Sequence, residues 1–396
     1  MHPASRFLAS FLVWLAGPYL FAYDAPPEPG TLLRRIAFGS CNTPLQPTPV
    51  WDAVLKHNPD AWLWLGDVVY ADTPPPTDPT PQARAQVVLD RQVKLYQLQR
   101  AIPAYQILRD KARVLGTWDD HDFGLNDDGA NFVGREEAQR NFLDFYAEPI
   151  DSPRRGRPGI YSSYRFGPPG RTVQVIILDT RYFRSPLRKE PRPPAEWVDG
   201  VRGSYVPSDH SADTLLGDAQ WQWLESALRE PADVRLILSS IQVVSDDHRF
   251  EKWGNFPHER RRLFTLIRDT GAQGVVFLSG DRHTGELSRL DPAREPNGEA
   301  LDPGYPLYDI TSSAMLRSRP TNFADQRPAA GPESPVSYVN EINRHRVGSP
   351  LAYNHFGLIT LEWEAEGGPQ MIISLHLDHG PEVLRHRIPL TALRRK

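Results

Sequence analysis

The chain has 396 residues, of which 40% are hydrophobic and 24% are charged. These proportions are ordinary for a globular protein, and they argue against a disordered chain. The formal net charge of −4 provides no excess of positive charge of the kind that marks nucleic-acid binding. The chain contains one cysteine, Cys41, so no disulfide can form within it.

The first 25 residues are predicted to be a signal peptide. Arg6 precedes an uncharged stretch at 7–22 that is rich in Phe, Leu, Val and Ala, and residues 24–30 are polar and proline-rich. The apolar stretch is short for a membrane span. We therefore expect a secreted or periplasmic protein. An uncleaved signal anchor, which would be its one link to a membrane, is the alternative.

The remainder of the chain, 31–396, is predicted to be a single α/β domain. Helical patterns cover 50–57, 84–101, 135–146, 218–229 and 258–269. Strand-like runs cover 35–40, 173–178, 235–239, 274–278, 307–310, 357–362 and 370–375. Prolines, 39 in all, gather in predicted loops at 74–81, 149–158, 186–207 and 320–335. The later strands have less helix between them, which favours a layered α/β sandwich over a simple doubly wound sheet.

Residues of types that bind metals stand where several apolar strands end. The stretches that contain them are Leu63-Trp64-Leu65-Gly66-Asp67-Val68-Val69-Tyr70, Trp118-Asp119-Asp120-His121-Asp122-Phe123 and Val276-Phe277-Leu278-Ser279-Gly280-Asp281-Arg282-His283. An aspartate after a strand is usually a cap or a turn residue. Cys41 follows a fourth strand, and a small buried hydrophobe is its alternative interpretation. Because open α/β sheets place their sites at the carboxyl ends of strands, the four positions together favour a metal site.

Two sets of ligands can be distinguished by their chemistry. The first offers a thiolate, a carboxylate, a phenolate and an imidazole, from Cys41, Asp67, Tyr70 and His283. Such an anionic set suits Fe(III). The second offers oxygen atoms, from Asp120, Asp281 and Gln242, and suits Ca²⁺, Mg²⁺ or Mn²⁺. If Asp67 bridged both sets, the result would be a two-metal centre that activates water for in-line attack at phosphorus.

In these motifs the chain resembles the alkaline phosphatase D-like (PhoD-like) metallophosphatases of the calcineurin-like metallophosphoesterase superfamily. The matching stretches follow the order of the family from about residue 34 to 290, with a looser match through Asn354-His355-Phe356-Gly357. They are Phe38-Gly39-Ser40-Cys41, Gly66-Asp67-Val68-Val69-Tyr70, Thr117-Trp118-Asp119-Asp120-His121-Asp122, Leu178-Asp179-Thr180-Arg181, Leu216-Gly217-Asp218-Ala219-Gln220 and Ser279-Gly280-Asp281-Arg282-His283.

The resemblance implies a four-layer αββα sandwich with two metals at the rim of its sheets. Fe(III) would be held by Cys41, Asp67, Tyr70 and His283, and Ca²⁺ by Asp67, Asp120, Gln242 and Asp281. Asp120 stands where the superfamily has an asparagine, and Asp281 where it has a histidine. These departures make the second site harder and more anionic, which favours Ca²⁺ over Zn²⁺ there, with Mg²⁺ and Mn²⁺ as further alternatives.

The resemblance also suggests catalytic roles. His121 would protonate the leaving group or bind phosphate, with Asp122 orienting it. Arg181 and Arg282 are candidates for bidentate phosphate binding, and a structural ion pair is the alternative for each.

The expected function is hydrolysis of a small-molecule or polymeric phosphate ester, as a phosphomonoesterase or phosphodiesterase, by a monomer. One alternative is a non-catalytic, metal-stabilised binding protein on the same fold. That reading predicts a broken ligand set, whereas every expected position carries a competent ligand. A redox enzyme with Cys- and Tyr-ligated iron is a third interpretation, but no glycine-rich dinucleotide motif follows a strand.

Overall fold

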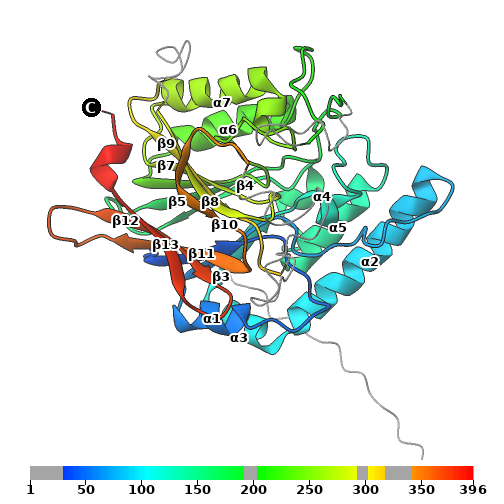
Figure 1. Cartoon of the computed structure of the whole chain (residues 1–396), viewed down its shortest axis with the longest axis horizontal. Coiled ribbons are helices and arrows are strands. Elements are labelled where there is room, and N and C mark those ends of the chain that lie inside the picture. The colour runs from blue at the N-terminus through cyan, green and yellow to red at the C-terminus, as the bar shows by residue number, and fades with distance from the viewer. Residues whose placement is uncertain (1–29, 191–202, 292–301, 317–340, 396) are drawn as a thin grey trace, which may run out of the picture.

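The computed structural model describes residues 30–190, 203–291, 302–316 and 341–395. Within these ranges the strands form one six-stranded and one seven-stranded sheet. Figure 1 shows helices α6 (Gly217–Arg229) and α7 (Pro257–Thr270) outside one sheet, and α1 (Val50–Lys56) and α3 (Pro103–Lys111) outside the other. The chain is therefore an α/β sandwich, which confirms the predicted fold class.

The six-stranded sheet has the order β13-β12-β11-β1-β2-β3. Its parallel half consists of β1 (Arg35–Gly39), β2 (Ala61–Leu65) and β3 (Arg113–Thr117). Its antiparallel half consists of β11 (His355–Glu362), β12 (Gln370–Leu377) and β13 (Glu382–Pro389), and β11 pairs antiparallel with β1. The three parallel strands thus end at one edge of the sheet.

The seven-stranded sheet has the order β10-β8-β9-β7-β6-β5-β4. Four strands are parallel: β5 (Val173–Ile177), β6 (Val234–Leu238), β7 (Val275–Ser279) and β9 (Leu307–Ser312). Antiparallel strands complete it: β4 (Ser162–Phe166), β8 (Gly285–Leu290) and β10 (Arg346–Leu351). Strands β5, β6 and β7 are buried along their whole length, as expected for parallel strands covered on both faces.

The remaining helices are α2 (Pro81–Ala101), α4 (Asp120–Phe123) and α5 (Arg135–Phe145). The hydroxyl of Thr80 accepts a hydrogen bond from the Ala83 amide at 3.2 Å and caps α2. Helix α2 ends because Ile102, which precedes a proline, is extended. All five predicted helices are present with ends shifted by a few residues. The sequence did not predict α3, the single turn α4, or strands β4, β8, β10 and β13.

One continuous hydrophobic cluster contains side chains from both sheets, including Phe38 of β1 and Phe277 of β7. Among the described residues, no helix is both long and apolar enough to cross a membrane. The predicted signal peptide lies outside the described residues. The predicted loop at 320–335 also lies outside them, as does most of the loop at 186–207.

Candidate metal centre

The candidate ligands stand directly after strand ends in both sheets. Cys41 follows β1, Asp67 follows β2, and Asp281 and His283 follow β7. All four have a positive φ, of 57°, 46°, 67° and 51° respectively. Non-glycine residues seldom adopt this conformation, and it is enriched at functional sites because the surrounding structure must hold it.

The first ligand cluster gathers around one carboxylate oxygen of Asp67. Its Oδ2 lies 2.9 Å from the Tyr70 hydroxyl and 3.4 Å from the Cys41 sulfur. The Tyr70 hydroxyl lies 3.0 Å from Nε2 of His283. Ligand atoms of Cys41, Asp67 and His283 all lie within 4.8 Å of one another. A thiol, a carboxyl, a phenol and an imidazole thus lie together in one small cluster.

A second cluster is made of carboxylates. Oxygens of Asp119, Asp120 and Asp281 lie within 4.8 Å of one another, and Asp120 also groups with Asp67 and His121 at that distance. Three carboxylate oxygens of this site are buried and have no hydrogen-bond partner among the described residues: Asp67 Oδ1, Asp119 Oδ2 and Asp120 Oδ1. Unpartnered buried carboxylate oxygens are unfavourable, and a bound cation would relieve this. The residues therefore fit a metal centre.

Burial dominates the electrostatics of this cluster. It raises the pKa of Asp67 to about 7, and it raises those of Asp119 and Asp281 well above their usual range, with neighbouring carboxylates adding to the shift. Burial acts the same way on Asp120, but the charges of His121 and Arg181, together with backbone hydrogen bonds from Asp127 and His121, outweigh it and lower the pKa to about 2. With these carboxyls ionised, the site would hold several negative charges close together, and a bound cation would stabilise them.

The carboxylate of Asp122 does not orient His121 as expected. It accepts hydrogen bonds from the backbone amides of Asp67, Val68 and Asp119 at 3.2, 3.1 and 2.6 Å. It therefore joins the loop after β2 to the loop after β3. The ring of His121 instead donates from Nδ1 to Asp72, whose Oδ1 lies 2.7 Å away. The sequence analysis missed Asp72, although it stands two residues after Tyr70 in the same loop.

The two arginines fit the ion-pair interpretation better than phosphate binding. Arg181 is fully buried and donates to Asp119 Oδ1 from Nε at 2.7 Å and to Glu251 from Nη1 at 2.7 Å. Arg282 is 4% exposed, and its Nη2 lies 2.9 Å from both carboxylate oxygens of Glu341. Arg181, whose Nε and Nη1 both bind carboxylates, has little capacity left for a bidentate contact with substrate, and Arg282 is paired with Glu341 through Nη2.

Gln242 is held by neighbours outside the two clusters. Its amide nitrogen donates to Glu286 at 2.6 Å and to Thr311 at 2.8 Å. Its side-chain oxygen, the atom that would bind a metal, lies 2.9 Å from Nε2 of His248. Its role as a ligand therefore stays a prediction.

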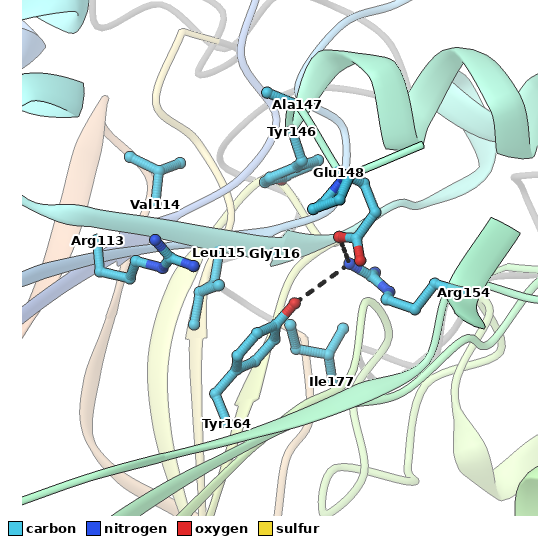
Figure 2. A pocket seen from close by; sticks show the side chains of 11 residues that line it. Arg113, Val114, Leu115, Gly116, Tyr146, Ala147, Glu148, Arg154, Tyr164 and Ile177 are labelled. Carbon is cyan, nitrogen blue, oxygen red and sulfur yellow. Dashed lines mark hydrogen bonds and ion pairs between the residues drawn. The ribbon is translucent and has the colours of Figure 1, made fainter. Parts of the chain in front are cut away.

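A separate cavity of about 40 Å³ lies beside β3 (Figure 2). Arg113, Tyr146, Arg154 and Tyr164 line it, and Arg154 donates to Glu148 at 2.6 Å and to the Tyr164 hydroxyl at 3.2 Å. The cavity can hold water but is small for a phosphate ester. It contains none of the predicted site residues, so we do not assign the chemistry to it.

The fold and site together define an α/β sandwich with a two-part cluster of metal-type ligands at the ends of its parallel strands. The family model of the PhoD-like phosphatases matches residues 36–304. The chain belongs to this family, and membership supports phosphate ester hydrolysis.

Individual proteins agree with this assignment. Alkaline phosphatase D from Bacillus subtilis (strain 168) is 26% identical over 196 residues, which are 44% of this chain and 31% of that protein. The matched region thus spans about a third of that relative's length. A solved structure titled "Structure of PhoD" superposes with a TM-score of 0.60 at 16% identity, covering 93% of this chain and 74% of that one. This second likeness shows the fold alone.

A further match is 28% identical over 144 residues to the homeobox protein Nkx-2.8 of Homo sapiens, covering 34% of this chain and 55% of that protein. Homeodomains are three-helix folds. Because this chain forms two packed sheets, that similarity carries no functional conclusion.

Proposed function

We propose that this protein hydrolyses phosphate esters at a two-metal centre. The observation that carries the proposal is the convergence of Cys41, Tyr70 and His283 on Asp67, next to the carboxylates of Asp120 and Asp281. The first set would hold Fe(III). The second would hold Ca²⁺, or another divalent ion, with Asp67 shared between the two and Gln242 as a predicted further ligand.

Such a centre supplies positive charge to the phosphoryl oxygens and a nucleophile derived from water near neutral pH. Phosphate ester hydrolysis has a very high uncatalysed barrier, so this electrostatic contribution is the largest that the site has to make.

The chain's own residues provide the remaining steps. Asp122 holds the loop that carries Asp67 through two backbone hydrogen bonds, and this fixes the carboxylate shared by both ligand sets. His121 is partly exposed, and its Nε2 lies 3.9 Å from Asp120 Oδ2. We assign to Nε2 the delivery of a proton to the leaving oxygen.

The wider proposal is an exported monomer whose residues 31–396 form one catalytic unit. Because Arg181 and Arg282 are held in ion pairs with carboxylates, recognition of phosphate would rest on the metals and His121.

The first test is elemental analysis and a visible spectrum of the purified protein, followed by hydrolysis assays. Tyrosinate bound to Fe(III) gives a purple charge-transfer band, so we expect a coloured protein with about one iron per chain. It should release p-nitrophenol from p-nitrophenyl phosphate or bis(p-nitrophenyl) phosphate. A colourless protein with divalent ions alone would refute the iron assignment. Stoichiometric metals with no hydrolysis of either ester would favour the binding-protein alternative.

A further inference from the structure

Ser313 stands directly after β9 and touches two of the candidate iron ligands. Its hydroxyl oxygen lies 3.0 Å from the Cys41 sulfur and accepts a hydrogen bond from the His283 backbone amide at 2.9 Å. Cys41 follows β1 in one sheet, and His283 follows β7 in the other. The side chains of Ser313 and Cys41 are fully buried. One hydroxyl therefore links two ligands that the two sheets contribute separately.

The hydrogen in the contact between Ser313 and Cys41 comes from the serine. A thiol has one hydrogen, and the Cys41 thiol donates it to Asp67 Oδ2, 3.4 Å away. The oxygen of Ser313 accepts from the His283 amide, and its own hydrogen can point at the sulfur. When a metal takes the place of the thiol hydrogen, the sulfur is a thiolate and accepts this hydrogen bond more strongly.

A second hydroxyl near the sulfur has its hydrogen directed elsewhere. Ser40 Oγ lies 3.6 Å from the Cys41 sulfur, and it donates to the backbone carbonyl of Ser312 at 3.1 Å. A serine hydroxyl has a single hydrogen, so this contact leaves none for the sulfur. Ser40 and Ser313 are both fully buried, and Ser40 is therefore a matched comparison for Ser313.

From these contacts we infer that Ser313 is a positioning residue of the iron site, whose hydroxyl holds the Cys41 sulfur beside the His283 loop and reduces electron donation from the thiolate to the metal. The inference rests on the proposed function. Hydrogen bonds to a ligating sulfur are a general means by which proteins tune thiolate-bound metals. Groups that orient metal ligands from outside contribute roughly 10- to 100-fold in metal affinity.

The test loads the metal-free full chain with Co(II), which gives a sulfur-to-metal charge-transfer band when a thiolate binds it. In Ser313→Ala the sulfur loses a hydrogen-bond donor and releases electron density more readily. We therefore expect the band to move to longer wavelength and the dissociation constant of Co(II) to rise roughly 10-fold. In Ser40→Ala the band should stay at the wild-type wavelength.

Ser313→Thr keeps the hydroxyl and should keep the wild-type band. A purely structural role of Ser313 would lower the metal content without moving the band. An unmoved band in Ser313→Ala, or an equal shift in Ser40→Ala, would overturn the inference, because the sulfur would then not depend on the hydrogen of Ser313. Thermal unfolding of each variant identifies any that does not fold.

A crystal structure of the metal-loaded wild-type protein provides a readout that needs no variant. We expect Ser313 Oγ to stay within hydrogen-bonding distance of both the Cys41 sulfur and the His283 amide. A hydroxyl turned away from the sulfur would refute the inference.

Failure of the proposed function gives a different result. A protein that shows the charge-transfer band but hydrolyses neither p-nitrophenyl ester refutes the proposed hydrolysis, and the bands of the Ser313 variants still decide the role of Ser313. A wild-type protein without the band shows that Cys41 does not bind the metal, which refutes both the iron site and the inference.

Discussion

The Tyr70 hydroxyl lies 3.0 Å from Nε2 of His283, although 213 positions separate the two residues. Tyr70 belongs to the loop after β2 in one sheet, and His283 to the loop after β7 in the other. The candidate iron site is therefore assembled between the two sheets of the sandwich, and it exists only when both sheets are packed together.

Asp67→Asn should abolish hydrolysis while leaving the protein folded. Asp67 belongs to both ligand clusters, so the loss of one carboxylate weakens both metals at once. Asparagine tolerates the backbone φ of 46° at this position. Circular dichroism should match the wild type, and metal analysis should show a reduced content of both ions. Full activity in this variant would be incompatible with the two-metal proposal.

Cys41→Ser should reduce iron retention more than retention of the divalent ion. The Cys41 sulfur lies 3.4 Å from Asp67 Oδ2, in the first cluster, and Cys41 is not part of the carboxylate cluster. Metal content per chain after dialysis is the measurement. An equal loss of both metals, or of neither, would show that Cys41 is not a selective iron ligand.

Gly66→Ala should destabilise the fold by about 2 kcal/mol or more. Gly66 has a φ of 98°, and an added Cβ would lie 2.5 Å from Cβ of Asp119. This close approach is what brings the Asp67 loop against the aspartates after β3. Gly156→Ala is the control, because nothing lies within 4 Å of its added Cβ. Urea unfolding of both variants checks the difference, and equal stabilities would contradict it.

His355 should make stability fall on mild acidification. It is fully buried, and burial lowers its pKa from 6.5 to about 4. The unfolded chain therefore takes up a proton near pH 6.5, while the folded chain does so only near pH 4. Stability is lost across that window as the pH falls, by at most about 1.4 kcal/mol per pH unit.

Urea unfolding at pH 7 and pH 5 measures this contribution. His355→Gln should lose less stability between the two pH values than the wild type does. His379→Gln is the control, because the side chain of His379 is 53% exposed. The same pH dependence in wild type and His355→Gln would show that the buried imidazole does not contribute.

Local features of the sequence were sufficient for the five predicted helices and for many of the strands, but not for α3, α4, β4, β8, β10 and β13. Apolar β-rich runs predicted β1, β5 and β7, and the polar residues that end these runs were visible in the chain itself. Short elements were missed: α4 is a single turn, and α3 follows α2 after one residue, Ile102. Their patterns are too short to separate from the flanking segments.

The pairing of side chains could not be predicted in the same way. Sequence adjacency suggested Asp122 as the partner of His121, whereas Asp72, 49 positions away, makes that contact. Likewise, Arg181 pairs with Glu251 across 70 positions, and Arg282 pairs with Glu341 across 59. No sequence pattern around Asp72, Glu251 or Glu341 indicates these contacts, because the side chains with which they pair lie in other strands and loops.

The sequence by itself determined which residue types stand at the strand ends, and hence the family. Only the tertiary structure decided which of them converge, which carboxylate holds His121 and which arginines are buried in ion pairs. The physical reason is that strand periodicity and strand-end chemistry are local properties of the chain. Side-chain contacts depend instead on how two sheets pack and on the path of the loops between them.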